Sequence, residues 1–500
     1  MKKISTVALA LGPIFAATVF SWPALAETKK DSVTLGMVLE PPGLDPTSAA
    51  SAAIGEITHY NIYEGLMKAD GSGSGTIDPL LAKSWSVSAD QATYTFTLRD
   101  GVTFQDGEAF TSAEVKFSFE RAAATDSTNK DKAFFATFSK IETPDSATII
   151  ITLKQPDPDF LFKLALPNSI IVDAKSAAGN ATKPVGTGPY RLESWAKGAS
   201  VTLAKWDGYR DPAKIAIAKA TFRIINDPSA QVAALLAGDI DAFPRFGAFQ
   251  SIAQFQADPR FAVTIGGTEG KTILAINNKR KPFDDIRVRR AIAHALDRKS
   301  IIDGAMNGFG APIGSHYVPI DPGYVDLTGT FPFDIDKAKA LLAEAGVALP
   351  LNVTLTLPPP AYARQGGEII AAQLAKIGIN AKIENVEWAQ WLSGTFKGKN
   401  FDLTMISHVE PMDLAIYANP DYYFQYDSPA FRDILAKVAA AATPDARLAA
   451  LGEAQRQLAN DAVNGYLFQL AQISVADKRL KGLWKDSPFF ANDLSALRWE

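Results

Sequence analysis

The side chains best suited to binding chemistry gather in a polar loop, Ser407 to Asp413, which follows an expected strand over 401–406. The loop holds the imidazole of His408 and the carboxyl groups of Glu410 and Asp413. An imidazole can bind nickel, but the chain has only four His, none paired at metal-ligand spacing, and no Cys. We therefore expect no metal here, and we interpret the loop as a candidate contact for a ligand.

Another carboxylate stands where the first expected strand ends. The run from Val33 to Leu39 predicts a strand, and Glu40 follows it directly. Pro41 and Pro42 come next and cannot continue a sheet ladder, so the strand ends in a fixed turn. Glu40 is then either an ordinary solvated acid or, where the strand end faces a cleft, a contact for a ligand cation.

Motifs that position reacting groups in hydrolases are missing. The sequence contains no Gly-x-Ser-x-Gly, no His-Glu-x-x-His and no Cys. A secreted hydrolase would therefore need a carboxylate or Ser/Lys site without a motif. The lack of Cys also excludes disulfides and thiolate metal sites. We expect a binding protein rather than an enzyme, with no catalytic residues and no cofactor.

Two glycine-rich stretches fall short of nucleotide-binding loops. In the stretch 184–190 the third glycine of G-x-G-x-x-G is replaced by Arg191, and Pro189 would obstruct a phosphate-binding helix start. In the stretch 266–272 the spacing from Gly266 to the Gly-Lys-Thr end is one residue short, and a strand follows instead of a helix. We interpret 184–190 as a rigid turn between lobes.

Length and composition bound the remaining possibilities. A chain of 500 residues exceeds what one hydrophobic core usually serves, so two or three lobes are expected. Hydrophobic residues make up 47% and charged residues 21%, as in ordinary globular proteins. The net charge of −4 gives no electrostatic case for nucleic acid.

The N-terminus has the pattern of a secretory signal. Lys2-Lys3 is the positive region, 4–20 is apolar, and Ala24-Leu25-Ala26 is a small-x-small cleavage site, so residues 1–26 are predicted to be removed. No later stretch reaches the roughly 18 uninterrupted apolar residues of a membrane span. Without a Cys for lipid attachment, the expected location is the periplasm, with no lipid anchor.

The middle of the chain predicts a passage between two halves. Ile273 to Ile276 is a continuous apolar run typical of a buried strand. A helix entry at Pro282-Phe283-Asp284 follows, with Asp284 as the expected cap and apolar residues at helical spacing from Val288 to Leu296. Alternating strands and helices continue to the C-terminus, which favours an α/β lobe.

The motifs resemble the extracytoplasmic solute-binding proteins of ABC importers, specifically family 5, the peptide-, opine- and nickel-binding group. The most specific match is 98–107, Leu-Arg-Asp-Gly-Val-Thr-Phe-Gln-Asp-Gly, followed by 111–115, Thr-Ser-Ala-Glu-Val. Supporting matches in family order are 186–190, 282–291, 341–346 and 401–403.

This resemblance implies an α/β, bilobal periplasmic-binding-protein fold of the cluster C type, with an extra subdomain inserted in lobe I. The implied segments are 27–62, 186–272 and 476–500 for lobe I, 63–185 for the inserted subdomain, and 273–475 for lobe II. Ligand is expected between the lobes, which close on it by a hinge.

The resemblance also implies function and partners. The expected role is to capture a short peptide or modified amino acid and deliver it to inner-membrane ABC permease subunits with their ATPases. A non-peptide solute such as an opine, a sugar conjugate or a nickel chelate is the alternative. The protein is expected to act as a monomer without nucleic acid.

The implied site departs from the peptide-binding pattern at one position. In peptide binders of this family an Asp four residues before a Pro anchors the ligand ammonium, and the corresponding residue here is Ser407, which carries no charge. His408, Glu410 or Asp413 can replace that Asp, with Glu40 as the opposing contact from lobe I. Otherwise the ligand lacks a free α-amine.

Further family contacts fall on aromatic and basic residues. Tyr362 and Arg364 lie where the family often contacts ligand, and Arg364 can bind a carboxylate in bidentate fashion. Trp388 and Trp391 lie three residues apart; they are either core residues or a wall of the cleft, and contact is expected for one of them.

Overall fold

The structure is a computed structural model and describes residues 30–49, 51–71, 76–441 and 443–500. Asp31 to Glu500 form one compact unit. The predicted signal peptide, 1–26, lies outside the described residues. Among the described residues, no helix combines the length and the apolar character that a membrane crossing requires.

An eleven-stranded mixed sheet is the largest element of the fold. Its strands lie in the order β15-β14-β16-β12-β17-β11-β1-β10-β9-β8, and β13 pairs with β17 off this path. The bounds are β1 Ser32–Met37, β8 Tyr190–Ala196, β9 Ser200–Lys205, β10 Lys219–Ile224, β11 Ala242–Phe243, β12 Phe261–Ile276, β13 Gly310–Pro312, β14 Leu351–Leu357, β15 Ile379–Asn385, β16 Leu403–His408 and β17 Gly465–Asp477.

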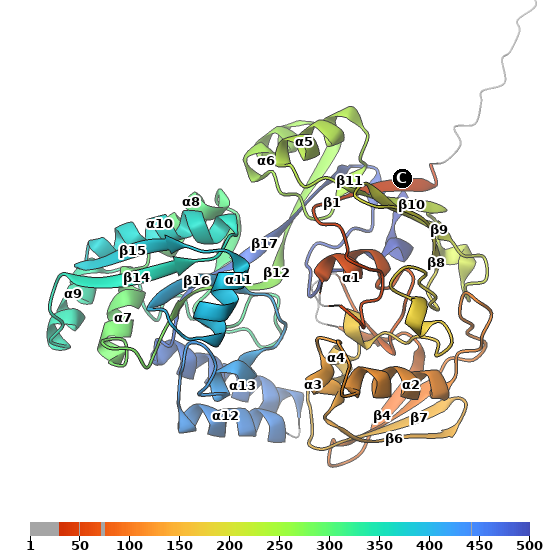
Figure 1. The fold of residues 1–500 in the computed structure, drawn as a ribbon, viewed down its shortest axis with the longest axis horizontal. Coiled ribbons are helices and arrows are strands. Elements are labelled where there is room, and N and C mark those ends of the chain that lie inside the picture. The colour runs from red at the N-terminus through yellow and green to blue at the C-terminus, as the bar shows by residue number, and fades with distance from the viewer. Residues whose placement is uncertain (1–29, 50, 72–75, 442) are drawn as a thin grey trace, which may run out of the picture. The chain divides into compact units, whose positions relative to one another are not determined.

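Two long antiparallel strands, β12 and β17, join the two sides of this sheet (Figure 1). The apolar run 273–276 is buried, as predicted, but it is the end of a 16-residue strand rather than a separate one. The sequence pattern predicts one strand over 261–265 and another over 273–276 with a loop over 266–272 between them, whereas the structure has one strand with a bulge there. Thr268 Oγ1 donates to Leu470 O at 2.8 Å and so keeps the bulge attached to β17.

Helices cover the sheet on the lobe II side, around β14, β15 and β16 (Figure 1). They are α7 Ile286–Ala295, α8 Arg298–Met306, α9 Ile335–Glu344 and α10 Ala361–Ala375. Val288, Ile292 and Ala295 of α7 enter the apolar core, as their spacing predicted. The cap of α7 is Asp285, which accepts from Arg287 N, one residue later than predicted. The loop over 282–284 is therefore longer than the sequence suggested.

A second apolar cluster completes this side of the molecule. Its aromatic members include Tyr417, Tyr423, Phe424 and Trp391. The cluster includes residues of the π-helix η5 Trp391–Lys397, the 3-10 helix η6 Leu414–Ala418, α12 Pro429–Ala440, α13 Pro444–Asn460 and the loops between them, and the short helix α11 Trp388–Gln390 directly precedes η5.

The residues 63–185 build a separate sheet with its own core. The strands β4 Ala82–Val87, β5 Thr93–Leu98, β6 Phe138–Asp145 and β7 Thr148–Leu153 lie in the order β4-β5-β7-β6. The helix α2, Ser112–Ala123, packs on this sheet through Val115 and Phe119. Thr111 with Glu114 three residues later predicts a capping box, which is confirmed: Thr111 Oγ1 accepts from Ala113 N at 3.2 Å, and Glu114 Oε2 accepts from Thr111 N at 3.0 Å. The remaining short elements here are β2 Met67–Ala69, β3 Ile77–Pro79, α3 Lys132–Phe135, α4 Phe160–Lys163, η1 Pro167–Ser169 and η2 Ala177–Gly179.

A buried ion pair ties the start of this segment to the strands of lobe I. Glu64 accepts from both terminal nitrogens of Arg210 at 2.7 Å, and Thr187 donates to the same carboxylate at 2.9 Å. Gly186 and Gly188 lie against the backbone of Asn61 and Ile62, where a Cβ would approach carbonyl oxygens to 2.0 and 2.3 Å. The glycines of 184–190 therefore allow close backbone packing, which agrees with a rigid turn.

The C-terminal segment packs against the first strand. Trp499 belongs to the same apolar cluster as Val33 and Leu35, and its indole nitrogen donates to Ser32 O at 2.9 Å. The other elements of this side are η3 Pro212–Lys214, α5 Pro228–Ala237, η4 Phe249–Ser251, α6 Ile252–Ala257, β18 Leu480–Lys481, η7 Leu494–Ala496 and β19 Arg498–Trp499. The boundaries of the expected lobes and of the inserted subdomain remain a prediction.

The sequence pattern over 57–67 predicts a helix, but most of this range is not helical in the structure. The structure places α1 at Ala52–Thr58 and ends it at His59, whose backbone is extended. Tyr60 then has a φ of 64°, which no helix can continue. The buried His59 ring donates from Nε2 to Ala165 O at 2.9 Å, so the chain turns inward here instead of continuing as a helix.

This histidine predicts a pH effect on stability. Burial lowers the pKa of His59 from 6.5 to about 3. Between these values the unfolded chain binds a proton at His59 that the folded chain does not, so His59 alone costs wild type about 1.4 kcal/mol of unfolding free energy per pH unit as pH falls below 6.5. His59→Gln lacks this loss, and its stability relative to wild type should improve by that slope between pH 6 and 4.5 in urea titrations. A difference in the free energy of unfolding between His59→Gln and wild type that stays constant with pH would contradict the lowered pKa of His59.

Candidate functional site

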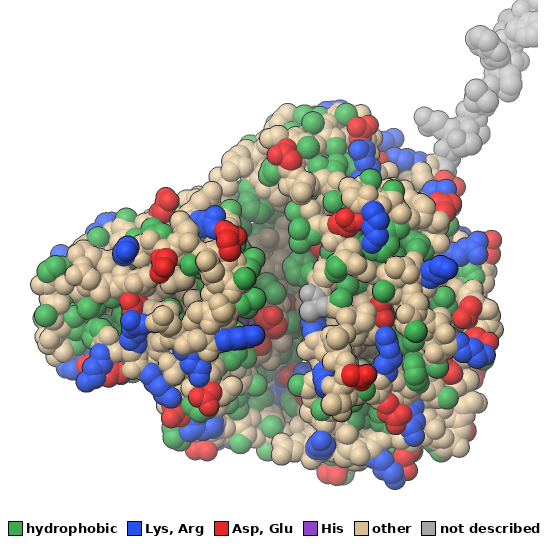
Figure 2. All heavy atoms as spheres, in the orientation of Figure 1, with side chains coloured by type: hydrophobic (Ala, Val, Ile, Leu, Met, Phe, Trp, Pro, Cys, Tyr) green, Lys and Arg blue, Asp and Glu red, His purple; other side chains and the backbone are tan. Residues whose placement is uncertain are grey.

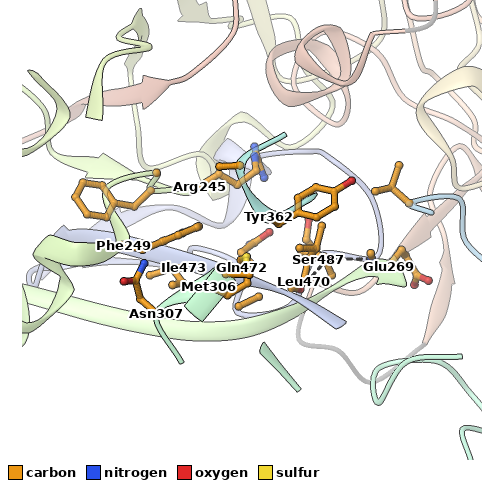
Figure 3. A pocket seen from close by; sticks show the side chains of 18 of the residues that line it. Arg245, Phe249, Glu269, Met306, Asn307, Tyr362, Leu470, Gln472, Ile473 and Ser487 are labelled. Atoms are coloured by element: carbon orange, nitrogen blue, oxygen red, sulfur yellow. Dashed lines mark hydrogen bonds between the residues drawn. The ribbon is translucent and has the colours of Figure 1, made fainter. Parts of the chain in front are cut away.

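A cavity of ≈ 490 Å³ lies where β12 and β17 pass between the two sides of the sheet. Its walls come from segments far apart in the sequence: 245–250 after β11, the bulge in β12, the end of α8, the start of α10, β17 and the loop 487–490. Figure 3 shows these side chains around the cavity, and Figure 2 shows the surface hollowed between the two halves. Concave sites of this size are typical of small-ligand binding.

Most of the lining is apolar. Phe246, Phe249, Met306, Ile473 and Phe490 contribute large side chains to the wall. Neutral polar groups are interspersed, among them Gln250, Asn307, Gln365, Gln472 and Ser487. Such a wall buries an apolar ligand body, and the few polar groups fix its orientation.

The bulge in β12 directs polar groups into this cavity. The pairing of Gly267 with Ala471 and of Lys271 with Gln469 leaves three residues, Thr268, Glu269 and Gly270, outside the regular ladder. All three line the cavity. β-bulges commonly re-aim side chains next to functional sites. Here Glu269 lines the cavity at the bulge, and its carboxylate lies 3.9 Å from the buried Lys271 ammonium.

A smaller cavity of ≈ 270 Å³ adjoins the first. Val409, Phe489 and Phe490 line both cavities and form the wall between them. The smaller cavity also touches Glu410 on the lobe II side and Lys130 on the side of the inserted subdomain. A ligand longer than the main cavity therefore has an adjoining space past Val409.

Lys271 forms the centre of a buried charge network behind the bulge. Its ammonium lies 3.2 Å from Asp413 Oδ1, 3.9 Å from Glu269 Oε2, and donates to Glu410 O at 2.5 Å. Burial would raise the pKa of Asp413, but His316 and Lys271 hold it well below its usual range. The network connects β12 with the loop that follows β16.

The carboxyl of Glu269 differs from that of Asp413. Burial, followed by the neighbouring carboxylate of Asp321, raises the pKa of Glu269 well above its ordinary value. Burial likewise raises the pKa of Asp321. Two neighbouring buried acids beside one lysine thus share a proton, and the pair carries about one negative charge.

His316, His408 and Asp413 are the one group among the described residues whose geometry could hold a metal ion, with ligand atoms within 4.8 Å of one another. Tyr417 and Tyr423 contact the far nitrogens of the two rings, each at 3.0 Å. The Lys271 ammonium, 3.2 Å from Asp413, already supplies positive charge at this cluster and would repel a divalent cation. The arrangement fits an ion-pair and hydrogen-bond network better than a metal centre.

The structure distributes the residues of the predicted polar loop over different environments. Ser407 donates its backbone N–H to Tyr362 Oη at 2.9 Å, and its own hydroxyl is buried without a partner. His408 and Asp413 are buried within lobe II and line neither cavity. Glu410 is exposed and lines the smaller cavity. Of this loop, only Val409 reaches the main cavity.

Of the predicted aromatic and basic contacts, one lines the main cavity and the others do not. Tyr362 lines the main cavity, whereas Arg364 lies outside it and donates to Glu387 at 3.1 Å. Trp391 is buried and donates to Thr404 Oγ1 at 3.0 Å, as a core residue does. Trp388 packs edge-on against Trp391 and is 43% exposed. Neither Trp lines the described cavities, and the ligand contacts themselves stay a prediction.

Glu40 lies at the end of β1, away from both cavities. Its carboxylate accepts from Gly198 N at 2.8 Å and from the indole nitrogen of Trp195 at 3.3 Å. Glu40 thus has partners in the β8–β9 turn. For Glu40 to bind a ligand cation as predicted, its hydrogen bonds with Gly198 and Trp195 would have to change.

The sequence interpretation missed Arg245 and Glu269, which line the main cavity. Arg245 follows a strand of only two residues, Ala242–Phe243, and no pattern marked it. Glu269 lay in the stretch 266–272, which was considered only as a phosphate loop. Its three glycines within five residues, inside an otherwise strand-like region, were the available signal for a bulge.

Comparison with known proteins identifies the class. The family model of bacterial extracellular solute-binding proteins, family 5 (middle), matches residues 76–425, and the chain belongs to this family of ABC-importer solute-binding proteins. The glutathione-binding protein GsiB of Salmonella typhi is 31% identical over 381 residues, covering 75% of this chain and 73% of GsiB. The di/tripeptide-binding protein 2 of Pseudomonas aeruginosa (strain UCBPP-PA14) is 30% identical over 433 residues, covering 79% and 80%.

Solved structures agree with the fold. The binding protein AgaA from A. tumefaciens R10, in complex with agropinic acid, is 29% identical with a TM-score of 0.79, covering 94% of this chain and 99% of AgaA. The periplasmic binding protein DppA from Helicobacter pylori, in complex with the peptide STSA, is 26% identical with a TM-score of 0.78, covering 94% and 98%. The predicted family and the α/β bilobal periplasmic-binding-protein fold are confirmed.

Proposed function

We propose that this chain captures a short peptide or a modified amino acid between its two lobes in the periplasm and delivers it to an inner-membrane ABC permease. The observation that carries the proposal is the ≈ 490 Å³ cavity, which residues of both lobes line. A cavity of this volume lies in the range typical of sites that bind small organic molecules.

The relatives support this solute class. GsiB binds glutathione by its name, and the Pseudomonas relative binds di- and tripeptides. The AgaA complex with agropinic acid favours a second candidate, an opine-like solute in the same cavity. Both candidates are small organic molecules enclosed by two lobes, so they share the same capture mechanism.

Capture requires that the closed state binds the solute more tightly than the open state. Contacts from both lobes supply this difference, because opening separates Arg245 and Phe249 of one side from Tyr362 and Met306 of the other. The strands β12 and β17 connect the lobes and are the hinge in this proposal. The protein acts as a monomer, and the permease recognises the closed form.

Solution scattering tests the capture step. The mature chain, Glu27 to Glu500, is measured alone and with saturating glutathione, a tripeptide mixture or agropinic acid. We expect the radius of gyration to fall with at least one of these solutes and to return after dialysis. Uptake of the same labelled solute by cells should be lost when the gene for this chain is deleted. Identical scattering curves with every solute would contradict the proposal.

A further inference from the structure

An ion pair joins the two halves of the molecule outside both cavities. Arg447 Nη2 donates to Asp159 Oδ1, and the two residues are 288 positions apart in the chain. Neither residue lines the main cavity or the smaller one. Among the described residues, no other ion pair links 63–185 with 273–475. The two halves therefore hold a charged contact that needs no solute to bridge it.

The pair lies at the edge of the cleft, on short stretches of two helices. Asp159 is the residue before α4, and Arg447 lies near the start of α13. In Figure 1, α4 and α13 are at the lower edge of the cleft, whereas β12 and β17 cross higher in the same view. A rotation about β12 and β17 displaces groups more the farther they lie from these strands, so opening must separate this pair.

On one side, the pair is attached to lobe I through the inserted subdomain. Arg121 of this subdomain has its Nη2 3.2 Å from Asp45 Oδ2. Asn168 Nδ2 donates to Pro46 O at 2.7 Å. These contacts are buried or partly buried, and they make the subdomain that carries Asp159 move with lobe I.

On the other side, α13 is attached to lobe II. Leu451, one turn after Arg447, belongs to the apolar cluster that also holds Tyr417 and Phe424. Gln455, one turn further, donates from Nε2 to Gly323 O at 2.7 Å. The helix that carries Arg447 therefore moves with lobe II. Each partner of the ion pair thus belongs to a separate core, and the pair reports on the position of one core relative to the other.

The two charges are largely withdrawn from water. The side chains of Arg447 and Asp159 are 16% and 17% exposed. Burial raises the pKa of Asp159, although Arg447 and Lys163 act to lower it. Removing one partner leaves the other charge partly buried and unpaired where the helices meet, whereas water hydrates it once they separate. Loss of either partner should therefore favour opening.

We propose that the ion pair between Asp159 and Arg447 is a latch between the inserted subdomain and lobe II, which stabilises the closed form without touching the solute. This inference rests on the proposed function, because it requires lobes that open and close. The latch gives the inserted subdomain a role in closure. It also sets how many molecules are closed before a solute arrives, and thereby tunes the affinity for any solute.

Single-molecule energy transfer tests the latch without a solute. Because the chain has no Cys, dyes on Ser86→Cys and Glu384→Cys, at exposed positions of β4 and β15, report only the distance across the cleft. The labelled mature chain is freed of bound solute by unfolding, dialysis and refolding. We expect Asp159→Asn and Arg447→Gln each to lower the ratio of closed to open molecules about tenfold, because a partly buried charge loses its partner.

Matched variants separate the latch from folding. Arg447→Lys keeps the charge and should restore part of the closed fraction. Combining Asp159→Asn with Arg447→Gln should lower the ratio by less than the two single factors multiplied. Lys437→Gln breaks an exposed ion pair between α12 and α13, within lobe II, and should leave the ratio unchanged. Thermal unfolding verifies that each variant is folded. Equal closed fractions in wild type, Asp159→Asn and Arg447→Gln would overturn the latch.

The same labelled proteins distinguish failure of the latch from failure of capture. Glutathione, a tripeptide mixture and agropinic acid are each added to saturation. If one of them closes wild type but the solute-free ratios of wild type and both single variants agree, the latch is wrong while capture stands. If the solute-free ratios differ as expected but none of these solutes changes them, the latch stands while the proposed function fails.

Discussion

Replacing Lys271 by Met is expected to lower the free energy of unfolding by about 3–5 kcal/mol, because it removes one partner of a buried ion-pair network. Asp413 would keep a buried charge without its lysine partner, and Glu269 would lose its nearest positive neighbour. The ammonium also donates to Glu410 O, so the loop after β16 should loosen. Urea titration with the folded fraction followed by circular dichroism measures the effect.

A control variant and a double variant show whether the loss of stability comes from the buried ion-pair network. Lys279→Met removes an exposed lysine near the end of the same strand and should change the free energy of unfolding by no more than about 0.5 kcal/mol. Adding Asp413→Asn to Lys271→Met removes both charges and should cost less than the sum of the single changes. A Lys271→Met protein as stable as wild type would show that the network does not hold the loop to β12.

Replacing Gln365 by Trp is expected to weaken solute binding at least a hundredfold. Gln365 is exposed on α10 and lines the main cavity. An indole at this position fills the space in which a solute would lie between Tyr362 and β17. No described residue makes a hydrogen bond to the Gln365 side chain, so folding should be preserved. Isothermal titration with the solute that compacts wild type measures the change.

The control for this prediction lies one turn away on the same helix. Glu368 is exposed but does not line the cavity. Glu368→Trp adds the same bulk to α10 and should leave affinity within about twofold of wild type, which corresponds to about 0.4 kcal/mol. Equal loss in both variants would place the effect in the helix rather than in the cavity.

Local signals in the sequence predicted much of the fold. The capping box at Thr111 and Glu114 and the apolar face of α7 depend on neighbours three or four residues apart, and both are confirmed. The join of 261–265 with 273–276 into one strand could not be derived this way. It depends on pairing with β17, about 200 residues later, and on Thr268 bonding to Leu470 O.

The sequence predicted only part of the candidate site. Tyr362 lines the cavity at a position that the family resemblance indicated. The chemistry of the segment 407–413 depends on Lys271. The carboxylate of Asp413 could bind a ligand cation if it were unpaired, but the Lys271 ammonium lies 3.2 Å from it and already pairs with it. That neighbour comes from a strand about 140 residues earlier, and spacing within the loop carries no information about it. Arg245 enters the site through a two-residue strand, which has no recognisable periodicity.

Native mass spectrometry of the mature chain, purified from its own periplasm without denaturant, shows whether a solute occupies the main cavity. We expect one small-solute mass per chain in wild type, released when the protein unfolds and absent from Gln365→Trp. The same solute should be retained by Glu368→Trp. A wild-type protein that binds no small solute, or a solute held equally well by Gln365→Trp, would contradict capture in this cavity.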